Sequence, residues 1–259
     1  MQRKPLVAGN WKMNMDTAQA VKLSQRISDR YDNDLDEIDI VLCPPFIDLK
    51  SVANVLEFDN SKMKLGAQNV YHLMPEGNAA ATGETSVKML ANVGCDYCII
   101  GHSERRQGFG ETDELINAKA LLLASNDIDP IICCGETAEI NDAGGTEAHV
   151  SAQIEAALKD YPAERIARAV LAYEPIWAIG TGRTPTPEFA NGVCHAIRSV
   201  VARMFGDTRA DAIRVLYGGS VKPGNATEFF SQPDIDGGLI GGAALDADNF
   251  IAIVRADLA

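Results

Sequence analysis

Eight short apolar runs recur along the chain, and segments with helical patterning lie between them. Each run is long enough for a buried strand and too short for a helix. Because the runs are almost continuously apolar, they are typical of a parallel sheet whose faces are covered. The runs cover residues 5–8, 38–43, 64–67, 97–100, 130–134, 169–172, 213–217 and 238–240.

The segments between the runs favour helices with recognisable starts. One begins behind a cap at Asp16 or Thr17, and another begins at Thr112 with acidic residues in its first turn, where the helix dipole favours them. Longer helices are expected over about 147–159 and 187–205. One face of the first helix is expected to comprise Ala20, Val21, Ser24, Ile27 and Tyr31.

This alternation predicts an α/β fold, a (β/α)8 barrel with eight parallel strands, because closing the sheet leaves no edge exposed. A chain of 259 residues suits one such barrel. No linker or shift in composition divides the sequence, so we expect a single barrel domain over residues 1–259.

Charge and hydropathy narrow the classes of partner. The net charge of −13 argues against a nucleic acid or an anionic membrane surface, and no apolar run approaches membrane-spanning length. The N-terminus leads directly into the first predicted strand without a signal peptide, so a cytoplasmic location is expected. An anionic substrate would have to be attracted by a local cation or by backbone amides.

The six cysteines fit that location. Cys95 and Cys98 have the spacing of a redox or zinc motif. However, no second pair and no nearby histidine completes a metal set. Buried free thiols are the better interpretation, and we expect no metal site.

The polar residues of the chain gather where the predicted strands end. In a parallel barrel these ends meet at one mouth, where barrel enzymes place their active sites. Glycine turns at this mouth offer convergent N–H donors that suit a phosphate. The sequence lacks the glycine-rich motifs of dinucleotide and nucleoside triphosphate sites and the H-E-x-x-H motif of zincins. The strand-end set includes Asn10, Lys12, Gln68, Asn69, His102, Glu136, Glu174 and the turns at 218–220 and 241–242.

Glu174 stands at the end of the sixth run and is followed by Pro175, which takes the chain out of the sheet. The next residues form an apolar, glycine-hinged segment that we interpret as a lid over residues 175–185. A carboxylate beneath such a cover suits proton transfer away from water. The alternative is a solvated glutamate at an ordinary turn.

His102 lies at the end of the fourth run, before a polar segment that is expected to be helical. A helix N-terminus favours a neutral imidazole, which can donate a hydrogen bond to a carbonyl oxygen. A hydrolase nucleophile elbow is disfavoured because Arg105 stands where its second glycine belongs. A structural role for a lone histidine is the alternative.

Together these motifs resemble those of the triosephosphate isomerase family. They span the whole chain in order, which shared fold alone would not explain. The matching stretches are residues 8–14 (AGNWKMN), 66–69 (GAQN), 100–106 (IGHSERR), 172–182 (AYEPIWAIGTG), 217–220 (YGGS) and 241–243 (GGA).

The resemblance implies a cofactor-independent isomerase of glycolysis and gluconeogenesis that interconverts dihydroxyacetone phosphate and glyceraldehyde 3-phosphate as a cytoplasmic homodimer. In this family Glu174 would be the base, His102 the neutral electrophile, and Lys12 and Asn10 the residues that hold substrate and stabilise charge. Backbone amides of Gly180, Ser220, Gly241 and Gly242 would bind the phosphate. Glu104 would orient Lys12, and Tyr217 would help to latch the lid.

Departures from the family pattern leave that proton-transfer set untouched. The insert over residues 70–81 is longer than usual, with Ala81 in place of a bulky aromatic residue, which affects the expected dimer contact. Arg183-Thr184-Pro185 replaces a more usual Lys-Thr-Ala hinge, and Ala244 replaces a common serine. Two rival functions are an aldolase that uses Lys12 as a Schiff base and a catalytically silent barrel that serves as a binding scaffold.

Overall fold

The computed structural model describes residues 3–73 and 80–256. Its eight parallel strands pair in sequence order, and β8 pairs with β1 to close the barrel. The predicted (β/α)8 fold is therefore confirmed. The strands are β1 (Leu6–Asn10), β2 (Asp39–Cys43), β3 (Lys64–Ala67), β4 (Tyr97–Ile100), β5 (Asp129–Cys134), β6 (Val170–Tyr173), β7 (Arg214–Tyr217) and β8 (Gly237–Ile240).

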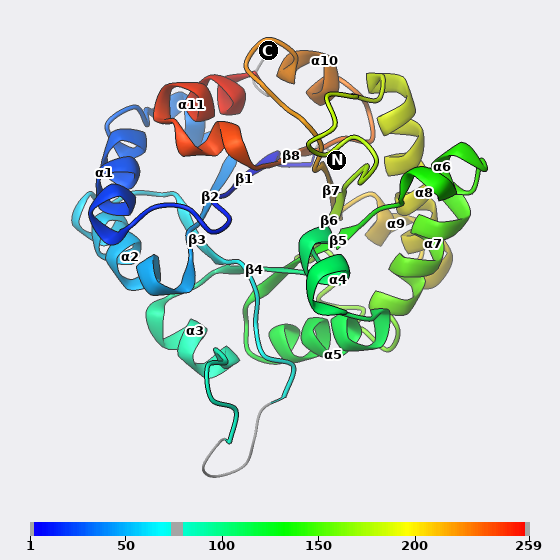
Figure 1. The fold of residues 1–259 in the computed structure, drawn as a ribbon, viewed down its shortest axis with the longest axis horizontal. Coiled ribbons are helices and arrows are strands. Elements are labelled where there is room, and N and C mark those ends of the chain that lie inside the picture. Colours follow the sequence, from blue (N-terminus) through cyan, green and yellow to red (C-terminus); the bar gives the residue numbers. More distant parts are fainter. Residues whose placement is uncertain (1–2, 74–79, 257–259) are drawn as a thin grey trace.

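Helices surround the barrel on its outer face, as the ring of coils around the central strands in Figure 1 shows. The α-helices are α1 (Thr17–Ser28), α2 (Leu49–Phe58), α3 (Val87–Val93), α4 (Ser103–Phe109), α5 (Asp113–Ala124), α6 (Ala138–Asp142), α7 (Thr146–Ala157), α8 (Pro187–Phe205), α9 (Asp207–Ala210), α10 (Ala226–Phe230) and α11 (Ala247–Arg255). Short 3-10 helices are η1 (Asn33–Glu37), η2 (Phe46–Asp48) and η3 (Gly242–Leu245).

The helix starts follow from local hydrogen bonding. Asp16 caps α1 by accepting the N–H of Gln19 at 2.9 Å, while the Gln19 side chain accepts the N–H of Asp16, also at 2.9 Å. Ala20, Ser24 and Ile27 are buried as expected. Val21 is only half-buried, and Tyr31 lies beyond the last residue of α1, so the predicted face was too wide.

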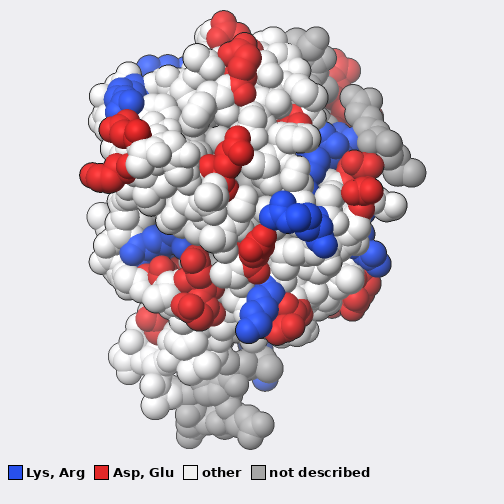
Figure 2. Space-filling view, turned by 90° about the vertical axis from the view of Figure 1, so that its right-hand side faces the viewer, with Lys and Arg blue, Asp and Glu red and all other residues white. Residues whose placement is uncertain are grey.

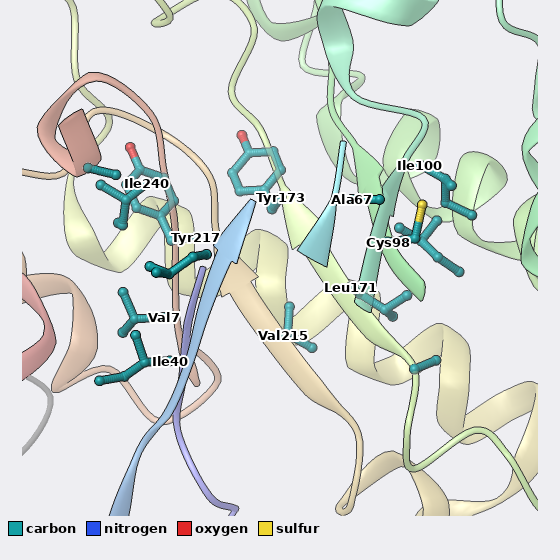
Figure 3. Close-up of a cluster of buried hydrophobic side chains, with 14 of the residues drawn as sticks. Val7, Ile40, Ala67, Cys98, Ile100, Leu171, Tyr173, Val215, Tyr217 and Ile240 are labelled. Atoms are coloured by element: carbon teal, nitrogen blue, oxygen red, sulfur yellow. The ribbon is translucent and has the colours of Figure 1, made fainter. Parts of the chain in front are cut away.

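Alternation along each strand divides the core into two parts. One set of side chains fills the barrel interior, including Leu6, Val41, Ile99 and Val170. The other set points outward and packs against the helices, and Figure 3 shows part of it. The residues labelled there are Val7, Ile40, Ala67, Cys98, Ile100, Leu171, Tyr173, Val215, Tyr217 and Ile240.

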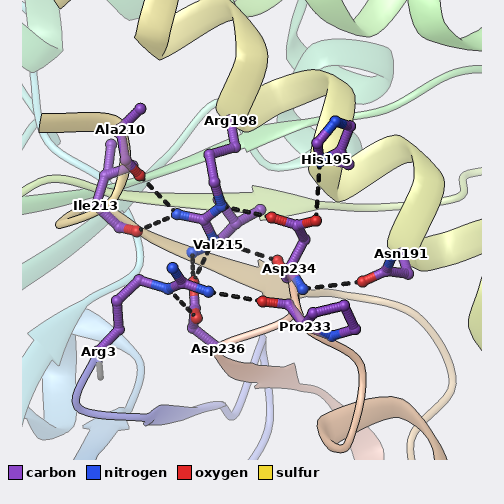
Figure 4. A network of polar contacts seen from close by, with 10 residues as sticks. All are labelled: Arg3, Asn191, His195, Arg198, Ala210, Ile213, Val215, Pro233, Asp234 and Asp236. Carbon is purple, nitrogen blue, oxygen red and sulfur yellow. Dashed lines mark hydrogen bonds and ion pairs between the residues drawn. The ribbon is translucent and has the colours of Figure 1, made fainter. Parts of the chain in front are cut away.

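At the end of the barrel where the strands begin, Arg198 of α8 organises a buried ion-pair network (Figure 4). Its guanidinium lies 2.7 Å from Asp234 and 2.7 Å from Asp236, and it donates to the carbonyl of Ile213 at 2.8 Å. Asp236 also accepts the N–H of Val215 at 2.8 Å. The network therefore joins α8 to the first residues of β7 and β8.

The surface in Figure 2 carries acidic and basic side chains interspersed among uncharged residues. No helix in the described part of the chain combines the length and the apolar character needed to cross a membrane. All six cysteines are buried and free, which confirms that interpretation of Cys95 and Cys98.

Candidate active site

The carboxyl ends of the strands surround a cavity of about 160 Å³, small for a ligand pocket and suited to a small molecule. Eight of the ten predicted site residues line it: Asn10, Lys12, His102, Glu174, Gly180, Ser220, Gly241 and Gly242. Ile179, Gly218, Gly219 and Leu239 line it as well. Glu104 and Tyr217 stand behind this lining and contact its members.

Glu174 follows the last residue of β6 and is 2% exposed, so the alternative of a solvated turn residue is wrong. Its carboxylate accepts the N–H of Ser103 at 2.9 Å and lies 3.0 Å from Nε2 of His102. Burial raises the pKa of Glu174, whereas His102, the Ser103 amide and Lys12 lower it. The lowering is the larger effect, so the pKa lies below its ordinary value. The carboxylate is thus held ionised although almost none of its surface reaches solvent.

The backbone at Glu174 depends on a close approach to Gly135. A Cβ atom at position 135 would lie 1.8 Å from the carbonyl oxygen of Glu174, which no side chain could occupy. The Glu174 N–H donates to the carbonyl of Cys134 at 2.8 Å. The end of β5 therefore fixes the position of the Glu174 backbone just after β6.

His102 is the N-cap residue of α4 and is buried, with 6% of its surface exposed. Its Nδ1 accepts the N–H of Glu104 at 3.2 Å, which leaves the proton on Nε2, facing Glu174. Burial lowers the pKa of His102, while the charge and hydrogen bond of Glu174 raise it, with a net rise. The hydrogen bonds seen here are those of a neutral imidazole, because a proton on Nδ1 would face the Glu104 amide.

Lys12 is held from several directions just after β1. Its backbone lies in the left-handed region with φ of 53°, and its N–H donates to the side chain of Asn10 at 3.0 Å. Its carbonyl accepts from the Gln68 side chain at 2.9 Å, and its ammonium lies 2.7 Å from Oε1 of Glu104. A residue in this region costs of order 1–3 kcal/mol, so the surrounding contacts impose the conformation.

The lid, residues 175–185, forms consecutive turns. The N–H of Ala178 donates to the carbonyl of Pro175 at 2.8 Å, and the Thr181 hydroxyl donates to the carbonyl of Trp177 at 3.1 Å. The indole N–H of Trp177 donates to the buried carboxylate of Glu136 at 2.7 Å. Burial raises the pKa of Glu136, although Trp177 and its other donors oppose the rise.

Tyr217 is fully buried beneath the glycine turn that follows β7. Its ring stacks on Phe229 at 4.3 Å between centroids, and its hydroxyl has no hydrogen-bond partner within the described residues. A Cβ atom at Gly219 would lie 2.1 Å from that hydroxyl. Tyr217 therefore supports the turn from behind.

Three further residues contact the predicted site residues or the lid, although the sequence led to no assigned role for them: Ser103, Gln68 and Glu136. Ser103 acts largely through its backbone N–H, for which the sequence has no signal. Gln68 and Glu136 stand at strand ends, and that position was the available signal. Within residues 3–73 and 80–256, no three His, Cys, Asp or Glu side chains are placed to hold one metal ion.

Comparison with known proteins agrees with this geometry. The chain is 49% identical over 255 residues to the triosephosphate isomerase of Streptococcus equi subsp. zooepidemicus, with 98% of each chain covered. It is 48% identical over 254 residues to that of Streptococcus pyogenes serotype M18, again with 98% of each chain covered. The family model described as triosephosphate isomerase matches residues 5–257, and the chain belongs to the triosephosphate isomerase family.

Proposed function

We propose that Glu174, His102 and Lys12 carry out the reaction of this family in the cavity at the strand ends. The chain is a triosephosphate isomerase, which interconverts dihydroxyacetone phosphate and D-glyceraldehyde 3-phosphate in glycolysis and gluconeogenesis. The observation that carries the assignment is a buried carboxylate 3.0 Å from an imidazole in a small cavity that Lys12 also lines.

Glu174 removes the proton from the carbon next to the substrate carbonyl, and the electron pair moves to the carbonyl oxygen to give an enediolate. Substrate oxygens replace Glu174 as the partner of Nε2 on His102. The neutral imidazole donates there and moves a proton between the two oxygens. Protonated Glu174 then returns its proton to the neighbouring carbon. Once Glu174 is protonated, the charge that raises the pKa of His102 is gone, so the neutral ring is favoured.

The remaining residues bind and orient the substrate. The Lys12 ammonium and the Asn10 side chain stabilise the developing negative charge, while Glu104 orients the ammonium from 2.7 Å away. Amides of Gly180, Ser220, Gly241 and Gly242 bind the phosphate. Tyr217, with a hydroxyl that lacks a partner in the described chain, latches the lid when it closes. We propose no metal or organic cofactor for the reaction.

The test is an assay with each triose phosphate in turn, with chelator present throughout. Isomerisation in both directions supports the assignment, and dependence on added metal contradicts it. Borohydride treatment with substrate separates the aldolase alternative, because an aldolase would be trapped through a Schiff base on Lys12. A silent scaffold would show no turnover in either direction.

We further propose that the whole chain, residues 1–259, forms one barrel domain in the cytoplasm and assembles as a homodimer through the segment over residues 70–81. Within that segment, residues 74–79 lie outside the described part of the chain. Leu73 is 51% exposed, and Met13 and Phe109, which line a hollow together with Lys12 and His102, are 95% and 71% exposed. Apolar side chains exposed in this way are typical of a contact surface. A fully active monomer at micromolar concentration in sedimentation experiments would rule the dimer out.

A further inference from the structure

Arg183 lies near the C-terminal end of the lid, yet its guanidinium is placed over the ring of Trp177 near the N-terminal end. Its Cζ atom lies 4.7 Å from the indole centroid. Its backbone N–H donates to the Thr181 hydroxyl at 3.2 Å, and that hydroxyl donates back to the carbonyl of Trp177. No ion pair in the described part of the chain includes Arg183, and its guanidinium contacts the indole of Trp177. The two ends of the lid are thereby joined.

Trp177 is also the residue that connects the lid to the barrel. Its indole N–H donates to Glu136 at 2.7 Å, and its ring meets Phe189 of α8 edge-on, with centroids 6.2 Å apart. Arg183 therefore covers a ring that α8 and Glu136 hold from the body of the protein. A planar guanidinium on an indole face is a favourable contact, because the ring quadrupole attracts the cation.

The lid does not seal the site in this conformation. Gly180 and Gly182 are exposed, and the cavity beneath the lid is partly open to solvent. The contacts of Trp177 with Glu136 and Phe189 hold the lid to the barrel in the unsealed conformation, and the guanidinium of Arg183 on the same ring reinforces that placement. A ligand that closes the lid has to overcome these contacts, and its apparent affinity falls accordingly.

We propose that Arg183 is a positioning residue. By stacking on Trp177 it helps to hold that side chain in the unsealed conformation, and it thereby sets how readily a bound phosphate ligand closes the lid. This inference rests on the proposed function of the lid. It concerns Arg183, an arginine at a position where the resemblance leads us to expect lysine. A lysine has no planar group to stack on the indole in the same way.

The first test is acrylamide quenching of tryptophan fluorescence in the ligand-free protein. The chain has two tryptophans, and Trp11 is fully buried, so quenching reports on Trp177. We expect Arg183→Ala to increase quenching and Arg183→Lys to have a smaller effect. Arg203→Ala is the matched control: it also removes a surface arginine, one that pairs with Glu155 at 2.7 Å on the outer helices, and should change nothing.

The second test is the dissociation constant of 2-phosphoglycolate, whose carboxylate and phosphate mimic the enediolate phosphate. Arg183→Ala should bind it about two- to fivefold more tightly, as expected for the loss of one exposed cation–π contact that opposes closure. Unchanged quenching would show that Arg183 does not hold Trp177 in place. Unchanged affinity would show that the contact does not oppose closure of the lid, and weaker binding would make Arg183 a phosphate ligand instead. Failure of the proposed function would appear separately, as absent isomerisation in the wild-type protein.

Discussion

The Nε2 atom of His102, just past β4, lies 3.0 Å from Oε1 of Glu174, just past β6. Strand β5 separates these two strands, so the contact exists because the barrel brings their ends to one rim. The Ser103 amide holds the other carboxylate oxygen at 2.9 Å. The carboxylate and its neighbouring imidazole are consequently positioned before any substrate arrives.

Replacing Glu174 by glutamine should abolish most turnover, because the amide cannot accept the proton. General-base loss typically lowers turnover by ~10²–10⁴-fold. Binding of 2-phosphoglycolate should stay within a few-fold of the wild type, since in our proposal backbone amides, and not Glu174, hold its phosphate. Steady-state kinetics and calorimetry measure the two quantities, and near-native turnover would show that another group is the base.

The same variant should alter the acid side of the stability profile. The pKa of folded Glu174 lies below its ordinary value of 4.5, so its stabilising contribution is present above that value and is lost as the pH falls through the lowered value. We therefore expect the Tm of Glu174→Gln to fall less steeply than that of the wild type below about pH 5. Parallel acid-side curves from thermal denaturation would contradict the lowered pKa.

Removing the charge of Glu104 should weaken the positioning of Lys12. Glu104→Gln keeps the shape but loses the ion pair at 2.7 Å, and we expect kcat/KM to fall about 3–10-fold, in line with ~1 kcal/mol for a half-exposed pair. Asp248→Asn is the control, because it removes a surface ion pair with Arg30 outside the active site. Equal values of kcat/KM for the two variants would show that Glu104 does not position Lys12 for the reaction.

Deleting residues 179–182 should lower turnover sharply and increase the release of inorganic phosphate and methylglyoxal per substrate consumed. An enediolate phosphate eliminates phosphate readily when it is not covered. Both products can be measured alongside isomerisation. A passive surface loop would predict native turnover without extra phosphate release.

The buried thiols should resist modification in the folded protein. Burial raises the pKa of Cys95 to about 12, and it raises the pKa of the other five cysteines as well, so little thiolate exists at about pH 8. A disulfide reagent at that pH should react slowly with the native protein. In urea it should react with all six thiols. One rapidly reacting native thiol would contradict this prediction.

Local patterns were sufficient to predict most of the fold. Strands β3 and β4 have the predicted bounds, and α8 begins and ends as expected because Thr186 caps it, Pro187 starts it and Gly206 stops it. The first helix shows the limit of such reasoning: α1 ends at Ser28, so the apolar periodicity that continued to Tyr31 belonged to the turn beyond it.

The candidate site likewise contains residues that the sequence could predict and contacts that it could not. Glu174, His102 and Lys12 could be placed at one rim because each follows a recognisable strand. The Ser103 amide and the Gln68 contact to the Lys12 carbonyl could not, because both depend on how separate βα units pack once the barrel closes. The stacking of Arg183 on Trp177 likewise required the lid conformation itself.

The network around Arg198 lies where β7 and β8 begin, whereas the cavity lies where the strands end. The barrel thus keeps this buried network and the Glu174–His102 pair at opposite ends of its strands. A substitution in the Arg198 network therefore changes contacts that none of the cavity-lining residues makes. We therefore expect such a substitution to change the stability of the fold while leaving the cavity intact.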